Sequence, residues 1–111
     1  MDDRRKHPRF PVDAPLRLTG AGTSVSGRLQ DICHDAALLE TEDPQPLGTF
    51  VTLSLQLPGT GEGDIVVSGK VIRTTPGESG RHASAVLFTE VPAAAAARIE
   101  VFLAQQAGAL G

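Results

Sequence analysis

The sequence has little of several residue types on which many small domains depend. Its 111 residues include one cysteine, four phenylalanines, no tryptophan and no tyrosine. A single cysteine excludes an internal disulfide, so nothing indicates an oxidising compartment. No apolar run approaches the roughly 20 residues that cross a bilayer, and the N-terminus lacks the apolar segment of a secretory signal. We therefore expect a cytoplasmic protein without membrane insertion, whose core consists of Val, Leu, Ile and Ala.

Positive charge is concentrated at the N-terminus. Residues 1–9 carry four cations against two carboxylates, a balance of +2, whereas the remaining residues carry six against eleven, a balance of −5. A protein that binds DNA or RNA is usually basic over a whole face. A basic head on an acidic body instead predicts a local site for a small anion.

The middle of the chain alternates with the period of a β-strand. Residues 49–57 place every second side chain on one apolar face, made of Val51, Leu53, Leu55 and Leu57. The glycine-rich residues 58–64 then predict a hairpin loop, so 65–73 should pair antiparallel with 49–57. Shorter candidate strands cover 14–19, 26–32, 37–41 and 82–88. Six such strands predict an antiparallel β-barrel, which leaves no exposed sheet edge.

The last part of the chain changes to helical period. Residues 93–106 are rich in helix formers, with Ile99, Phe102 and Leu103 at helical spacing and Gly108 as the expected terminator. The fold class is therefore all-β with a C-terminal helix. We expect a ligand-clamping loop at 1–12, the barrel with its helix at 13–107, and a tail at 108–111.

The first motif is the pair Arg5 and Arg9, within Arg-Lys-His-Pro-Arg. Arginine suits phosphate because its planar fork gives two parallel hydrogen bonds and stays charged, and its flat face stacks on purines. Pro8 biases His7 toward an extended conformation, so the pair should lie on a loop. The alternative is an ordinary solvated basic terminus.

The second motif lies in residues 30–39, where a polar turn joins two predicted strands. Asp31 could accept two N–H bonds from the Watson–Crick edge of guanine. The alternative is a β-turn in which Asp31 and Asp35 bond to local backbone N–H groups.

Together, the two motifs resemble those of the PilZ domain family of bacterial cyclic-di-GMP receptors. That family has an RxxxR motif in an N-terminal loop and a [D/N]xSxxG motif on a six-stranded barrel with a C-terminal helix. Arg5 and Arg9 match the first motif, and Asp31 matches the start of the second. Residues 69–71 and 83–88 also resemble family strands, so the resemblance spans nearly the whole chain.

Two residues depart from the family motif: Cys33 stands at its Ser and Ala36 at its Gly. A thiol is a weaker hydrogen-bond donor than a hydroxyl, and Ala is disfavoured where φ is positive or a ligand approaches closely. If each change costs about 1 kcal/mol, binding weakens by about 30-fold.

The resemblance implies a receptor that binds cyclic-di-GMP without chemistry, metal or other cofactor. It signals to an unidentified protein partner when its N-terminal loop orders over the barrel. The implied roles are phosphate clamping and guanine stacking for Arg5 and Arg9, guanine-edge recognition for Asp31, and lining of the turn for Cys33 and Ala36, with Arg4 and His34 as secondary candidates.

Other classes of function fit less well. A PilZ-like protein-interaction adaptor that has lost nucleotide binding would account for Cys33 and Ala36. A barrel for single-stranded nucleic acid would need stacking aromatics on a basic face, and the sequence has neither Trp nor Tyr. A metal set of Cys33, His34, His7 and His82 lacks any recognised ligand spacing, and no catalytic or phosphate-loop motif is present.

Overall fold

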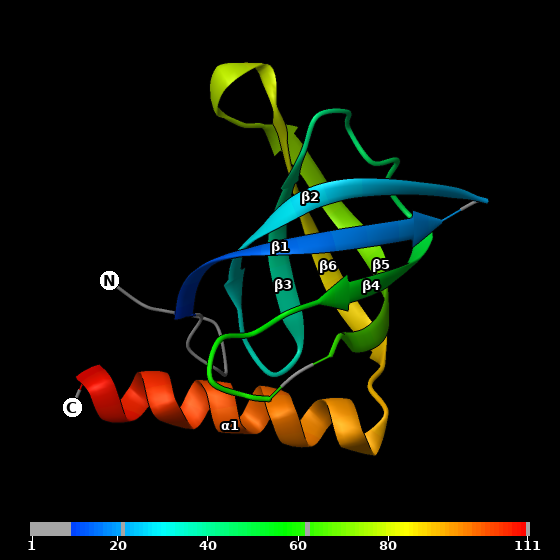
Figure 1. Cartoon of the computed structure of the whole chain (residues 1–111). Helices are drawn as coiled ribbons and strands as arrows, with labels where there is room; N and C mark the ends of the chain where they lie inside the picture. Colours follow the sequence, from blue (N-terminus) through cyan, green and yellow to red (C-terminus); the bar gives the residue numbers. More distant parts are fainter. Residues whose placement is uncertain (1–9, 21, 62, 111) are drawn as a thin grey trace.

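The computed structural model describes residues 10–20, 22–61 and 63–110, which form a barrel and one helix (Figure 1). The elements are β1 (Phe10–Gly20), β2 (Thr23–Ile32), β3 (Ala36–Thr41), β4 (Phe50–Leu55), β5 (Ile65–Pro76), a short 3₁₀ turn (Glu78–Gly80), β6 (His82–Glu90) and α1 (Ala93–Leu110). The strands close in the order β1-β2-β3-β6-β5-β4, with every neighbouring pair antiparallel. The predicted six-stranded antiparallel barrel with a C-terminal helix is confirmed.

The predicted hairpin between β4 and β5 is also confirmed. The two strands pair from Phe50↔Lys70 to Leu55↔Ile65. The connecting loop contains Gly59, Gly61 and Gly63, each with φ between 78° and 107°. Only glycine adopts this backbone region without strain, which is why the loop is built from glycines.

Strand β1 begins at Phe10, four residues earlier than the alternation predicts, so residues 10–12 belong to the barrel and not to the expected loop. The first half of the strand contains Pro11 and Pro15, and proline is uncommon within strands, so the sequence did not predict a strand there. These prolines are tolerated because β1 pairs with β4 only from Leu16 onward, whereas its pairing with β2 already begins at Phe10 and is interrupted only between Pro11 and Ala14. A missing proline N–H costs little where the strand has a neighbour on one side only.

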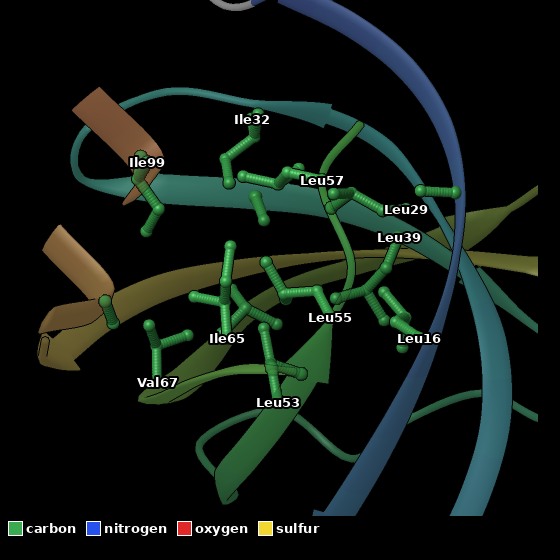
Figure 2. Close-up of a cluster of buried hydrophobic side chains, with 14 of the residues drawn as sticks. Leu16, Leu29, Ile32, Leu39, Leu53, Leu55, Leu57, Ile65, Val67 and Ile99 are labelled. Carbon is green, nitrogen blue, oxygen red and sulfur yellow. The ribbon is translucent and has the colours of Figure 1, made fainter. Parts of the chain in front are cut away.

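The core contains the residues that alternate inward from the strands (Figure 2). The four predicted apolar positions of β4 and its extension, Val51, Leu53, Leu55 and Leu57, are all at most 4 % exposed. Helix α1 lies across one end of the barrel (Figure 1) and adds Ala95, Ile99, Phe102 and Leu103 to the same core. The helical spacing of the last three therefore identified the buried face.

The helix continues through Gly108 to Leu110, so the predicted end at Gly108 is wrong. A glycine in a helix costs only about 1 kcal/mol relative to Ala, and the neighbouring Ala and Leu residues favour the helix. Across the described residues, no helix combines the length and the apolarity that crossing a bilayer needs.

Candidate functional site

Asp31 lies near the end of β2, where the regular alternation of the strand is interrupted. Leu29 and Ile32 are fully buried, whereas Gln30 and Asp31 between them are both half-buried. The register between β2 and β3 shifts here, because Leu29 pairs with Leu39 and Asp31 already pairs with Leu38. The extra residue is a β-bulge, a feature that re-aims a side chain and is common beside functional sites.

The start of β1 runs directly alongside Asp31. Phe10 pairs with Ile32 and Pro11 pairs with Asp31. Phe10 is the residue that follows the Arg-xxx-Arg motif in the sequence. Arg4, Arg5 and Arg9 themselves lie outside the described residues.

The turn between β2 and β3 contains the rest of the second motif. The Cys33 N–H donates to the Ala36 carbonyl at 2.9 Å, which closes the turn, and the Phe88 N–H donates to the Asp35 carbonyl at 2.7 Å, which ties it to β6. Cys33 is only 7 % exposed, so its thiol lies mostly inside the protein.

Ala36 does not have the positive φ that its glycine-like motif position suggested. Among the described residues other than glycine, only Ser79 has a positive φ. Ala36 is the first residue of β3 and pairs with Leu87 in ordinary strand conformation. An alanine here therefore carries no backbone strain, and the expected penalty of that kind is absent.

His34 connects the turn to the C-terminal helix. Its Nε2 contacts Oε1 of Glu100, and both side chains remain substantially exposed. The motif turn is thus held from two sides, by β6 and by α1. Because β2, β3, β6 and α1 all meet at this turn, its position follows from the tertiary structure.

A small polar network, which the motif comparison did not identify, adjoins the bulge. Gln30 Nε2 donates to Glu40 Oε2 at 3.3 Å, and Arg81 Nη1 lies 3.8 Å from Glu40 Oε1. These side chains come from β2, β3 and the segment before β6. The signal in the sequence was the pair of polar residues between Leu29 and Ile32, which breaks the period-two alternation.

The predicted site residues that the structure describes do not line a groove on the barrel surface. That groove has a volume of about 780 Å³ and runs along β1, β2 and β4. Its charged residues are of both signs: the cations are Arg17, Arg28 and Arg81, and the anions are Glu42, Asp43 and Asp64. Hydrogen bonds from Ser54 and Gln56, aided by Arg98, hold the pKa of Asp64 below its ordinary 3.8. Because its charges are mixed, this groove offers an anion no net positive charge.

The chemistry available at the Asp31 site is recognition by hydrogen bonds. The site offers a carboxylate, a closed turn and nearby polar side chains. Within the described ranges, no three His, Cys, Asp or Glu side chains gather to hold a metal ion.

The chain matches a known family over most of its length. The model of the PilZ domain covers residues 3–105. No curated protein matches the chain.

Three solved structures illustrate the likeness of fold. The PilZ domain with c-di-GMP of YcgR from Escherichia coli superposes with a TM-score of 0.71 at 13 % identity, over 96 % of this chain and 95 % of that one. The Bacillus subtilis inhibitor of motility, MotI/DgrA, gives 0.78 at 15 % identity, over 96 % of this chain and 53 % of that one. The MrkH–c-di-GMP complex of K. pneumonia gives 0.77 at 18 % identity, over 98 % and 55 %. This chain therefore spans about half the length of MotI and MrkH.

Proposed function

Because this chain belongs to the PilZ domain family, we propose that it is a receptor for cyclic-di-GMP that signals through a partner protein and performs no chemistry. The observation that carries the proposal is the register of β1 against β2. Pro11 pairs with Asp31, and the Arg-xxx-Arg motif ends two residues before Pro11. Consecutive Cα atoms are 3.8 Å apart, so the chain keeps the Cα of Arg9 within roughly 8 Å of Pro11, the neighbour of Asp31.

In this proposal the dinucleotide is held by complementary charges. Arg5 and Arg9 clamp the phosphates and stack on guanine, since guanidinium groups do both. The Asp31 carboxylate accepts hydrogen bonds from the N–H groups of a guanine edge. Arg4 and His34 are secondary contacts.

Cys33 and Ala36 line the turn beneath the nucleotide. Cys33 exposes 7 % of its surface and Ala36 has ordinary strand conformation, so the two departures from the family motif remove a hydroxyl and add a methyl group. Without backbone strain at Ala36, the expected weakening is about 5-fold and arises mainly from the lost hydroxyl.

The direct test is calorimetric titration of cyclic-di-GMP into the purified protein. Binding should be seen at micromolar to millimolar nucleotide, and Arg9→Ala should remove most of it. Asp31→Asn should weaken it by about 10-fold or more, because one hydrogen bond to a charged acceptor contributes roughly 1.5–3 kcal/mol. Asp13→Asn is the matched control: Asp13 lies on the neighbouring strand β1, its side chain is 81 % exposed, and it forms an ion pair with Arg28.

A second candidate function, an adaptor without nucleotide binding, is favoured by the burial of Cys33. It predicts no heat with cyclic-di-GMP at any of these concentrations, and such a result would overturn the receptor proposal. If binding is seen but Arg9→Ala leaves it unchanged, the nucleotide lies elsewhere on the barrel.

A further inference from the structure

An apolar surface lies on the outside of the barrel, away from the core. Its large side chains are well exposed: Leu47 by 67 %, Phe50 by 66 %, Ile72 by 51 % and Leu87 by 43 %. These four residues are called the outer apolar surface below. Single exposed apolar residues are ordinary, but a contiguous group of them marks an interaction site.

Strand pairing places these residues side by side. Phe50 of β4 pairs with Lys70 of β5, and Lys70 pairs with Leu87 of β6. The three form one row across adjacent strands, which are about 4.8 Å apart. Ile72 follows two residues after Lys70 on the same face of β5, and the Gly48 N–H bonds to the Val71 carbonyl, which brings the segment after Leu47 to this part of β5.

Two positively charged side chains lie among these residues. The Lys70 ammonium lies 5.6 Å from the centre of the Phe50 ring, a cation–π contact. A β-bulge between Val71 and Arg73 turns Arg73 outward beside Ile72, and Arg73 is exposed. Two cations thus border the outer apolar surface, although residues 10–111 together carry a net negative charge.

The closed barrel restricts what can bind here. A peptide that adds a strand needs an open sheet edge, and Lys70 and Leu87 already pair with a neighbouring strand on both sides. An α-helix can instead lie across the face, with its side chains at i, i+3, i+4 and i+7 on Phe50, Ile72 and Leu87. We propose that the outer apolar surface binds an amphipathic helix of a partner protein, whose apolar stripe is flanked by Asp or Glu side chains facing Lys70 and Arg73.

Charge argues against three other occupants. A second copy of this chain in a two-fold dimer would place Lys70 and Arg73 of both copies together. An anionic membrane attracts clusters of about 4–8 basic residues, and this surface has two on a chain of net charge −3. If the basic segment 1–9 of this chain occupied the surface, its Arg and Lys side chains would face Lys70 and Arg73, which carry the same charge.

The test is a selection from displayed helical peptides in which the flanking positions are randomised between Glu and Lys. The full chain serves as bait, without nucleotide. Peptides with Glu flanks and large apolar anchors should be enriched. Enrichment of Lys-flanked peptides, or of no helix at all, would overturn the proposal.

Variants of the bait locate the binding surface. The double variant Phe50→Thr/Leu87→Thr should weaken a selected peptide by at least about 10-fold, since two large anchors are lost. Val66→Thr is the matched control. Val66 is 46 % exposed and lies on β5, two rows away from Lys70. The affinity of this variant for the selected peptide should stay within about two-fold of the parent chain's. Lys70→Glu should weaken the Glu-flanked peptide and improve its Lys-flanked counterpart.

Two further measurements distinguish the other occupants. In sedimentation, the chain alone should not self-associate through this surface, so the double variant should sediment like the parent chain. Anionic vesicles should likewise bind the parent chain and the double variant equally. A difference in either measurement would assign the surface to a second copy or to a membrane, and would contradict the helix proposal. None of these measurements involves nucleotide, so the inference stands or falls independently of the proposed receptor function.

Discussion

Gly69 on β5 tests whether close packing of the barrel strands selects glycine there. A Cβ atom at this position would lie 2.5 Å from Val86 Cγ1 and 2.7 Å from the carbonyl oxygen of Leu87. Ordinary van der Waals contact begins at 3.4 Å, so an added Cβ would overlap with both atoms. Gly69 is also one of the residues on which the resemblance to the family rests.

The size of the effect follows from what the added methyl group meets. Val86 is fully buried, and Leu87 is held by pairing to Ala36 on one side and Lys70 on the other. Since neither neighbour can move away alone, Gly69→Ala should cost about 3 kcal/mol, the upper part of the range for overpacked cores. For a domain of this size, that lowers Tm by about 12 °C.

The assay is urea and thermal unfolding followed by circular dichroism, because the chain has no Trp or Tyr for fluorescence. Gly108→Ala is the control with the opposite sign. Gly108 lies within α1 and a Cβ there meets nothing within 4 Å, so the change should stabilise by about 0.5 kcal/mol. If Gly69→Ala unfolds within about 0.5 kcal/mol of the parent chain, the steric explanation of this glycine is wrong.

Three further predictions concern polar side chains. Arg98 of α1 donates to the carbonyls of Thr60, Gly61 and Gly63, so Arg98→Leu should cost about 1.5 kcal/mol and speed amide exchange in the 58–64 loop. Ser54→Ala should raise the depressed pKa of Asp64, as followed in a carboxyl NMR titration. The stability that ionised Asp64 contributes is present above pH 3.8 and is lost as the pH falls through the lower pKa that Asp64 has in the folded protein. Ser84 is fully buried and its hydroxyl has no hydrogen-bond partner in the part of the chain that the structure describes, so Ser84→Ala should leave stability unchanged or raise it by up to about 1 kcal/mol in urea unfolding.

Each of these three predictions has a control variant or a result that would refute it. Arg17→Leu removes an exposed arginine that donates a side-chain hydrogen bond to Ser24, and it should cost less stability than Arg98→Leu. An equal loss would refute the loop contacts. An Asp64 pKa that does not move in Ser54→Ala would show that this hydrogen bond is not formed. A loss above about 1 kcal/mol in Ser84→Ala would mean that the hydroxyl is bonded in solution.

Much of the fold was predictable because alternation and glycine positions report local structure. The inward row of β4, the glycines of the following loop and the helical stripe of α1 all appeared where the sequence placed them. The early start of β1 was not predictable, since Pro11 and Pro15 are tolerated only because β4 leaves that half of the strand unpaired on one side. The extension of α1 through Gly108 was missed because a small local penalty was outweighed by the surrounding helix formers.

The candidate site was partly predictable. Asp31 was identified from its motif, and the bulge that presents it could be recognised in the broken alternation of residues 29–32. The contacts that hold the motif turn could not be predicted from the sequence, because they join distant parts of the chain. His34 contacts Glu100, 66 residues later, and the Phe88 N–H of β6 donates to the Asp35 carbonyl. The roles assigned to the site residues remain predictions: Arg5, Arg9, Asp31, Cys33 and Ala36, with Arg4 and His34 as secondary contacts.

The sequence by itself determined the class of fold, the charge asymmetry and the identity of the two motifs, since these depend on periodicity and composition along the chain. Only the tertiary structure decided what lies beside the second motif and what the outside of the barrel offers. Pro11 and Asp31 become neighbours through strand register, Ala36 takes ordinary strand geometry, and Phe50, Ile72 and Leu87 gather on one face. The physical reason is that pairing between strands far apart in sequence is set by closure of the whole barrel, which no local pattern specifies.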